Sequence, residues 1–467
     1  MIRCGILRIM KEKGEREKNT DELLGQKRVF PLLMKMAIPT VISMFIQSMY
    51  NVVDSIFVAQ WRQEALTAVS LAYPMQNLVL AISVGAGVGI GSRISRSLGE
   101  KKPDEANVYA AHGGLLTLFN AFVFLMAGLF LSAPFLSLYT EDASIFAQGL
   151  SYLRIVVSSA VFSLVYIFIE KLLQAVGNTL FPMIMQGVGA LVNIVLDPIF
   201  IFGWGAIPAM GVSGAAIATV IGQAVSCGLA IVFFIFRSGG LRLFPKGFRF
   251  SWKKIGAICA VGVPSGLMLA MPSVLVSIMN AILDSISEAA VNFYGVFYKL
   301  QTFIYVPASG LVQGMRPIVG YNHGAKDFKR VDETVLYSVL FVGAIILLGT
   351  VLFEAIPGPI LSLFDSEGEL QKIGVLALRI LSSGFVISTL GVILSGAFEA
   401  LGMGIKSLLV TLTRQFVLIP LLSLVFMPFW GLTGVWITYP IAETAAAVLA
   451  VVFYLRYRKK RENVVST

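Results

Sequence analysis

Two aspartates lie inside apolar segments that are long enough to cross a lipid bilayer. Asp54 lies in the segment 39–58, and Asp197 lies in the segment 181–202. A charged side chain at the centre of a spanning helix costs about 2.5–3.5 kcal/mol even on the lenient insertion scale. Residues of this kind usually face a cavity inside the protein. The two aspartates therefore predict an ion or substrate pathway through a membrane.

The composition of the chain is that of a membrane protein. Hydrophobic residues make up 57% of the 467 residues and charged residues 13%, whereas soluble domains carry roughly 45–50% and about 25%. The apolar runs are continuous over about 20 residues, as bilayer-spanning helices require. They lack the short alternating pattern of a β-barrel strand. We therefore predict an all-α polytopic membrane protein.

The apolar runs predict twelve spanning helices. An even number of spans places both termini on the same side of the membrane. The spans are expected near residues 32–58, 66–91, 107–131, 145–170, 178–203, 212–236, 255–283, 289–318, 331–355, 370–398, 405–428 and 432–456.

The charges between the spans predict the side of the membrane on which each connection lies. Connections rich in Lys and Arg alternate with connections that are poor in them and often acidic. The positive-inside rule places the basic connections, and with them both termini, in the cytoplasm. The net charge of +10 thus indicates topology and not nucleic-acid binding. The basic set is Arg93, Arg96, Lys101, Lys102, Arg237, Arg242, Lys246, Arg249, Lys253, Lys254, Lys326, Lys329, Arg330, Arg456, Arg458, Lys459, Lys460 and Arg461, and the acidic set is Glu141, Asp142, Asp284, Glu288, Asp365, Glu367 and Glu369.

The chain repeats itself with an offset of about 220–225 residues. Segment 211–223 matches 431–443, with glycines at the first and fourth positions, and segment 174–183 matches 399–408. Two halves of six spans each share one topology, so we expect an axis along the membrane normal and a central cavity between them. The predicted divisions are a tail at 1–30, an N-lobe at 31–236, a basic linker at 237–254, a C-lobe at 255–456 and a tail at 457–467.

At this point the motifs become recognisable as a set. In order and in duplicate, they resemble those of the multidrug and toxic compound extrusion (MATE) family from about Pro39 to Tyr454. The resemblance implies two six-helix lobes in a V shape. It also implies export of bulky, often cationic organic compounds in exchange for protons or sodium ions. The matching segments include QSMYNVVDSIFVA (47–59), GNTLFPM (177–183), NIVLDPIFIFG (193–203), GVSGAAIAT (211–219), RPIVGYNHGA (316–325) and GLTGVW (431–436).

The resemblance also implies a polar site in the N-lobe that couples transport to a cation. Its members are Gln47, Tyr50 and Asp54 on the first span, Asn193 and Asp197 on the fifth, and Thr219 on the sixth. Tyr50, Asp54, Asn193 and Asp197 are also expected to contact substrate, and Na⁺ would lie at Asp54, Asn193 and Asp197. The sodium-coupled branch of the family has a glutamate early in the seventh span. This chain has Pro272 near that place, which favours the N-lobe site for coupling.

Helical spacing supports the same grouping. Gln47, Tyr50 and Asp54 fall on one face of a helix, and Gln186, Asn193 and Asp197 fall on one face of another. A polar stripe on an apolar spanning helix faces protein or water and not lipid. If the two aspartates lie within several Å of each other, they bind protons as a coupled pair. We therefore expect cationic cargo and proton to compete for them, each favouring a different orientation of the transporter.

Four other features have competing interpretations. Glu443 lies inside the twelfth span, where a substrate-binding and a structural role are equally supported. Lys299 is the one obvious cavity cation, either paired with an acid or contacting substrate. Glu399 is expected at a cytoplasmic helix end, in contact with solvent. The run GAGVGIG (85–91) lies inside a span, so close helix packing explains it better than phosphate binding.

The expected partners are small organic cations, H⁺ or Na⁺ and membrane lipids, with no cofactor and no nucleic acid. No G-x-x-x-x-G-K-[ST] motif occurs, so ATP hydrolysis and enzyme activity are not expected. The location predicted is the inner or plasma membrane of a bacterium, with the protein as a monomer. A lipid or lipid-linked oligosaccharide flippase is the alternative, but it would need a basic cavity for pyrophosphate. A membrane scaffold or enzyme would need neither buried carboxylates nor an internal repeat.

Overall fold

The computed structural model describes residues 20–237, 240–245, 247–364 and 369–465 of the chain. The described residues are almost entirely helical, and their one extended pairing is an isolated bridge between Trp204 and Ile207. The elements in chain order are η1 (Glu22–Gln26), α2 (Val29–Trp61), α3 (Gln63–Gly99), α4 (Pro103–Phe130), α5 (Ser132–Leu136), α6 (Ala143–Ser158), α7 (Val161–Ala175), α8 (Leu180–Phe202), α9 (Val212–Arg237), α10 (Trp252–Asp284), α11 (Glu288–Gly324), α12 (Phe328–Ala355), α13 (Pro357–Ser362), α14 (Glu369–Ser383), α15 (Phe385–Ala400), α16 (Gly404–Leu412), η2 (Thr413–Leu418) and α17 (Ile419–Val465).

The predicted fold class is confirmed, and the chain is a multi-pass membrane protein. Among the described residues, eight helical segments are long and apolar enough to cross a membrane, or up to ten if each of two bent pairs is one span. One of the eight, 404–463, contains Gly431 with a φ of 55°, where two helices meet at a kink inside α17. If this segment is divided at Gly431, each bent pair is counted as one span, and the 37-residue helix α11 is added, the number of spans is consistent with the twelve predicted.

Two predicted spans are broken in the middle, which the sequence analysis missed. α6 and α7 are bent by 42°, and α14 and α15 by 47°. The breaks fall at Ser159 and Ala160 in the first half and at Gly384 in the second, beside the serine pairs 158–159 and 382–383. Sharp kinks without proline commonly occur at such Ser and Gly pairs. The repeat of the serine pair could have predicted both bends.

The internal repeat is visible in the backbone. α2 and α10 both have 33 residues, α3 and α11 both have 37, and α4 and α12 both have 28. Lys101 and Lys326 adopt φ angles of 59° and 60°, although non-glycine residues rarely have a positive φ. The two halves are therefore copies of one structural unit.

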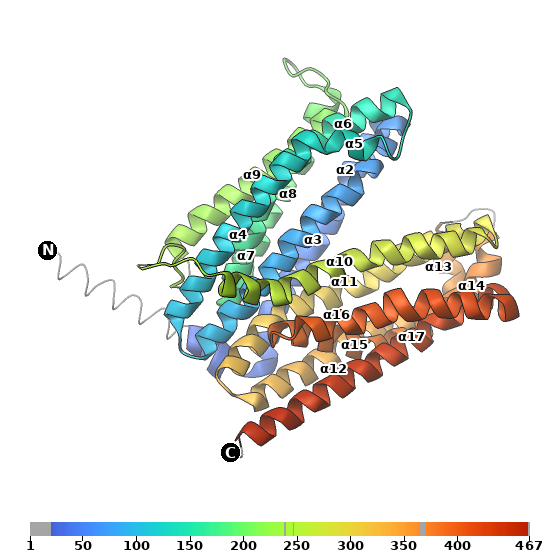
Figure 1. The fold of residues 1–467 in the computed structure, drawn as a ribbon. Helices are drawn as coiled ribbons and strands as arrows, with labels where there is room; N and C mark the ends of the chain where they lie inside the picture. Colours follow the sequence, from blue (N-terminus) through green and yellow to red (C-terminus); the bar gives the residue numbers. More distant parts are fainter. Residues whose placement is uncertain (1–19, 238–239, 246, 365–368, 466–467) are drawn as a thin grey trace.

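The two copies form two lobes. Figure 1 shows α2–α9 in one lobe and α10–α17 in the other, diverging in a V that opens on the side away from the two chain termini. The lobes meet where α3 packs along α10 and α2 along α11. A Cβ atom at Gly85 would lie 2.6 Å from the carbonyl oxygen of Gly262, and one at Gly89 would lie 2.3 Å from that of Ile258. Close packing is therefore the role of the glycine run, as predicted.

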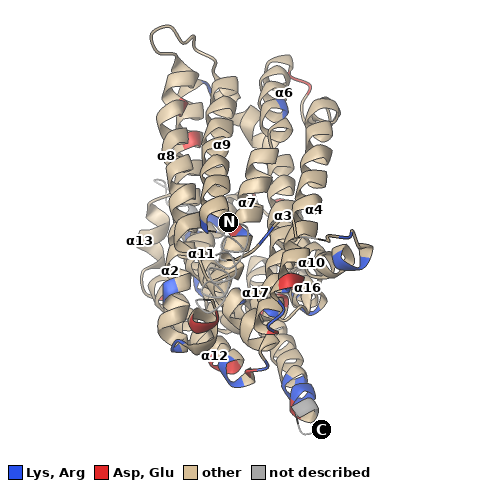
Figure 2. Cartoon of the chain, turned by 90° about the vertical axis from the view of Figure 1, so that its left-hand side faces the viewer, with Lys and Arg blue, Asp and Glu red and all other residues tan. Residues whose placement is uncertain are grey.

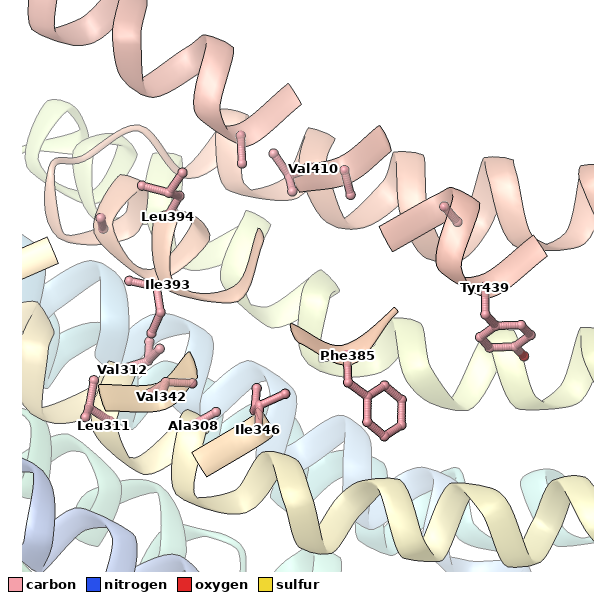
Figure 3. Packing of buried hydrophobic residues seen from close by; sticks show 14 of the residues in the cluster. Ala308, Leu311, Val312, Val342, Ile346, Phe385, Ile393, Leu394, Val410 and Tyr439 are labelled. Atoms are coloured by element: carbon pink, nitrogen blue, oxygen red, sulfur yellow. The ribbon is translucent and has the colours of Figure 1, made fainter. Parts of the chain in front are cut away.

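The apolar core consists of three clusters. The largest contains side chains of α11, α12, α15 and α17, some of which Figure 3 shows, together with Leu32, Leu33 and Met36 of α2. Two smaller clusters lie in the N-lobe, one around Leu153 and one around Ile90 that includes Ile258 of α10. The clusters therefore hold the helices of each lobe together and also join the two lobes through α2 and α10.

The N-terminal segment crosses the closed end of the V. Asp21 forms an ion pair with Lys101 and accepts a hydrogen bond from the Tyr321 hydroxyl. These two bonds hold the pKa of the Asp21 carboxyl below its usual range. The Arg330 guanidinium donates to the carbonyl oxygens of Leu24 (3.2 Å) and Lys27 (2.8 Å). The segment thus connects helices of both lobes.

The linker between the lobes is bound to α4. The Arg242 backbone N–H donates to Asn107 Oδ1 (2.8 Å), and the Ser251 N–H bonds to His112 Nε2 (2.9 Å). Lys254 forms an ion pair with Glu105.

The lysines and arginines gather mainly near the helix ends around the C-terminus, and the middles of the helices carry few charges (Figure 2). Of the predicted regions, residues 1–19 and 466–467 of the tails, and Lys246, Asp365 and Glu367 of the connections, lie outside the described residues.

Candidate functional site

The N-lobe contains a polar cavity of about 460 Å³. Five of the predicted site residues line it: Gln47, Tyr50 and Asp54 on α2, Asn193 on α8 and Thr219 on α9. Gln186 on α8 also lines it, as its helical spacing with Asn193 suggests. The polar stripes of two helices thus face one cavity.

Asp197 lies directly behind the cavity wall. It is fully buried, and its Oδ1 atom accepts a hydrogen bond from Asn193 Nδ2 (3.1 Å). The same amide nitrogen lies 3.5 Å from Thr219 Oγ1. Asp54 lines the same cavity as Asn193. The structure therefore connects both aspartates to one cavity, Asp54 directly and Asp197 through Asn193.

Several acceptor oxygens at this place have no hydrogen-bond donor. They are Asp54 Oδ1, Asn193 Oδ1, Asp197 Oδ2 and Gln223 Oε1, all buried among the described residues. Buried polar atoms in folded proteins almost always have a partner, and exceptions require an explanation such as a bound ion or water. Pro198 leaves one more acceptor in α8 without a donor, because proline has no backbone N–H to bond to the carbonyl oxygen one turn earlier. A cation or a transferred proton would satisfy this cluster.

Two charged residues of the N-lobe cavity were missed by the sequence analysis. Lys171 and Glu170 line the cavity near the junction of the lobes and form an ion pair of 3.3 Å. Lys171 Nζ also donates to Gln174 Oε1 (3.1 Å) and to Gln313 Oε1 of the other lobe (2.7 Å). Both residues fall at the predicted end of the fourth span, near residue 170.

The C-lobe has a cavity of its own, of about 290 Å³. Two ion pairs line it. Arg414 Nη1 donates to both carboxylate oxygens of Glu443, at 2.9 and 3.1 Å, and Arg316 pairs with Glu399. Glu399 also accepts a hydrogen bond from Ser265 Oγ. Glu443 thus lies in the C-lobe cavity, away from the N-lobe site residues.

Two interpretations of charged residues need correction. Glu399 is not in contact with solvent, because it is 2% exposed and paired with Arg316. Lys299 is not the one obvious cavity cation: it is exposed on α11 and lines neither of these two cavities. Lys171, Arg316 and Arg414 line them instead. Arg316 and Arg414 lie inside predicted spans, so the cost of a buried charge could have identified them as it identified Asp54.

No group of three or more His, Cys, Asp or Glu side chains in the described part of the chain could hold a metal ion. Cys227 and Cys259 are free thiols.

Known proteins share this architecture over most of the chain. The MatE family profile matches residues 39–199 and 264–429. The multidrug export protein MepA of Staphylococcus aureus (strain MSSA476) is 24% identical over 436 residues, which cover 92% of this chain and 95% of MepA. MepA of Staphylococcus haemolyticus (strain JCSC1435) is 26% identical over 443 residues, covering 93% and 95%.

A solved structure shares the same fold. A crystal structure of MATE in the bent conformation superposes with a TM-score of 0.89 at 25% identity, covering 96% of this chain and 99% of that one. The profile matches both halves, as the internal repeat requires. The chain therefore belongs to the MATE family of membrane transporters.

Proposed function

We propose that this chain exports lipophilic organic cations from a bacterial cell in exchange for protons or sodium ions. It would do so as a secondary active antiporter in the inner or plasma membrane. The MepA relatives are multidrug export proteins, which supports the substrate class. MATE transporters are not enzymes in general, and we propose no reaction for this one.

One observation carries the proposal: the acceptor oxygens of Asp54, Asn193 and Asp197 that have no donor. None of the ion pairs among the described residues involves either aspartate. Two acids without a cationic partner, in the interior of a membrane protein, favour a cation or a proton as ligand. The same atoms would bind an ammonium group of a cargo molecule.

Competition for these oxygens gives a mechanism of exchange. Each ligand shifts the equilibrium between two orientations only by its difference in affinity for them. The proton or Na⁺ enters from outside and displaces the cargo, and cargo from the cytoplasm displaces the ion. Exchange of one monovalent ion for one monovalent cationic cargo moves no net charge, so the concentration gradient of the ion drives it, at about 1.4 kcal/mol per tenfold ratio. Each further ion moves one net charge inward and adds about 2.3 kcal/mol per 100 mV.

The opening of the V supports an outward-facing assignment for this conformation. The lobes contact each other at the end where α3 meets α10, near Lys101, Lys102 and Lys254. The positive-inside rule places that end in the cytoplasm. The cavity of Asp54 would then open to the outside, ready to release cargo and to take up the ion.

Efflux of ethidium from energised cells or vesicles tests the proposal. Asp54→Asn and Asp197→Asn should each reduce coupled efflux at least tenfold, since an amide cannot exchange a proton or neutralise a cation. Removal of the pH gradient and of sodium in separate experiments identifies the coupling ion. Asp284→Asn is the matched control, because Asp284 is exposed at the end of α10 and lines neither cavity.

Full efflux by Asp54→Asn under both gradients would contradict the coupling assignment. The alternative of a lipid-linked oligosaccharide flippase needs its own assay, since the cavities contain more cations than the sequence suggested. Translocation of a pyrophosphate-linked lipid, with no efflux of ethidium, would favour the flippase.

A further inference from the structure

The two cavities differ in the polar groups that lack a hydrogen-bond partner. The N-lobe cluster has only acceptor oxygens without donors. In the C-lobe cavity, Gln415 Oε1 is such an acceptor, but Arg316 Nε is a buried donor without an acceptor. The hydrogen bonds of Arg414 to the described residues both leave from Nη1, so its Nε and Nη2 groups remain to be used. Both guanidinium groups line one cavity.

We propose that the C-lobe cavity binds the carboxylate of a zwitterionic organic cargo. The inference rests on the proposed export function and narrows its substrate class. A guanidinium group has five N–H donors in a planar fork and can serve two carboxylates at once. Arg414 and Arg316 each use part of that capacity on a glutamate, which leaves donors that a cargo carboxylate can occupy.

The position of the C-lobe cavity explains why the cargo is zwitterionic and not simply anionic. Met44, Val84 and Gln313 line both cavities, so the two adjoin. A cargo with an ammonium group toward Asp54 and a carboxylate toward Arg414 satisfies both sets of unpartnered atoms. Volumes of about 290 and 460 Å³ suit small-molecule sites, which take roughly 300–1,000 Å³.

A purely structural role for the arginines is the competing explanation. Buried ion pairs stabilise a protein no better than well-packed apolar residues of similar volume, so stability alone does not require two of them. A structural pair would also be enclosed by protein. Here the side chains of Arg414 and Arg316 are 19% and 23% exposed, and both line the cavity.

A matched pair of fluorescent probes separates the two explanations. Rhodamine 110 carries a free carboxylate, and rhodamine 123 is its methyl ester with the same cationic ring system. Binding to the purified full-length chain is measured by fluorescence anisotropy. The double variant Arg414→Gln/Glu443→Gln keeps the cavity neutral. It should bind rhodamine 110 about tenfold or more weakly, the value of a lost charge-assisted bond, and rhodamine 123 within about twofold.

The single variant Glu443→Gln gives a prediction of opposite sign. It frees Arg414 from its internal partner, so rhodamine 110 should bind several-fold more tightly. If Glu443 itself bound the cargo's cation, both dyes would bind more weakly, and that result would overturn the inference. Arg414→Lys keeps the ion pair but loses the planar fork and the Nε donor, so it should weaken rhodamine 110 binding. It replaces the double variant if that variant fails to fold. Arg154→Gln, at an exposed arginine of α6, is the control.

The binding assay does not depend on transport, so the two proposals can fail separately. If the unaltered chain and all of the variants bind both dyes with equal affinity, the carboxylate site is overturned. That result leaves the proposal of ethidium export untouched. Loss of coupling in the ethidium assay overturns the export function, while discrimination between acid and ester still identifies the site. Displacement of rhodamine 110 by a short-chain anionic phospholipid, but not by benzoate, would overturn the inference in favour of a lipid headgroup.

Discussion

The N-lobe and the C-lobe have the same helix order but differ in how the acids of their cavities are paired. The N-lobe pairs Glu170 with Lys171. Its two aspartates, Asp54 and Asp197, have no cationic partner among the described residues. In the C-lobe, Glu399 pairs with Arg316 and Glu443 with Arg414. The backbone of the repeat is retained, while the electrostatics of its two copies differ. One lobe needs a positive ligand, and the other is already neutral.

The repeat shows where the difference arises. Gln174 occupies the place of Glu399 in the two matching motifs, and Gln223 occupies the place of Glu443. Two amides of the first half are thus carboxylates in the second. Arg414 supplies the charge that one of these acids requires, at a position that corresponds to Gly189 with the offset of 225. A duplicated fold can therefore carry two different sites.

The largest expected effect that tests this comparison is on stability. Glu399→Gln leaves the Arg316 charge without its partner, which should lower the free energy of unfolding by about 3 kcal/mol. Asp197→Asn removes a buried charge that has no cationic partner, so it should leave the free energy of unfolding unchanged or raise it. Thermal unfolding of the purified variants in one detergent measures both. Equal destabilisation by the two changes would show that the lobes do not differ in this way.

The fold could be predicted well from the sequence. The free-energy cost of exposing backbone polar groups and charges to lipid depends on residues that are close together in the chain. Twelve apolar runs and the alternation of basic connections depend on neighbouring residues only, and the repeat appears by comparison of two segments. The stripe of Gln47, Tyr50 and Asp54 was found for the same reason, since helical spacing places residues on one face.

The pairing of charges in the C-lobe site could not be predicted in the same way. Arg316 and Glu399 lie 83 residues apart, and the pairing depends on how α11 and α15 pack. Glu399 lies near the end of its helix, so a position in solvent was a reasonable expectation. The hydrogen bond of Lys171 to Gln313 of the other lobe likewise depends on the tertiary structure. Long-range pairing and helix ends are therefore the features that sequence patterns describe least well.

An intermediate effect is expected at the junction of the lobes. Gly89→Ala would place a methyl group 2.3 Å from the Ile258 carbonyl oxygen, which is backbone and cannot move aside easily. Overpacking of this kind costs about 1–3 kcal/mol. Gly228→Ala in α9 is the control, since nothing lies within 4 Å of its Cβ position. Alanine favours helix there by up to about 1 kcal/mol.

Thermal unfolding and efflux together show what the junction does. If the lobes contact each other at Gly89 as described, Gly89→Ala lowers the unfolding temperature and reduces efflux, and Gly228→Ala does neither. An unchanged unfolding temperature for Gly89→Ala would mean that the lobes are not in close contact there, so the two cavities would not adjoin.

The smallest effect concerns the connection between the lobes. The hydrogen bond from Lys254 holds the pKa of Glu105 below its usual range. A lowered pKa in the folded state stabilises the fold above the unfolded value of about 4.3, and the stabilisation is lost as the pH falls through the folded value. Because the Glu105 side chain is 33% exposed, the contribution is less than about 1 kcal/mol. Glu105→Gln should therefore lower the unfolding temperature slightly at pH 7.

The same variant should unfold at the same temperature as the unaltered chain at acid pH, below the folded pKa of Glu105, where both side chains are neutral. Glu141→Gln is the control, because Glu141 is exposed in the connection before α6 and should show no difference at either pH. A difference that persists in acid would mean that Glu105 stabilises the linker through packing and not through its charge. The linker would then be attached to α4 by packing, as side chains are in the C-lobe core, and this attachment would not depend on pH.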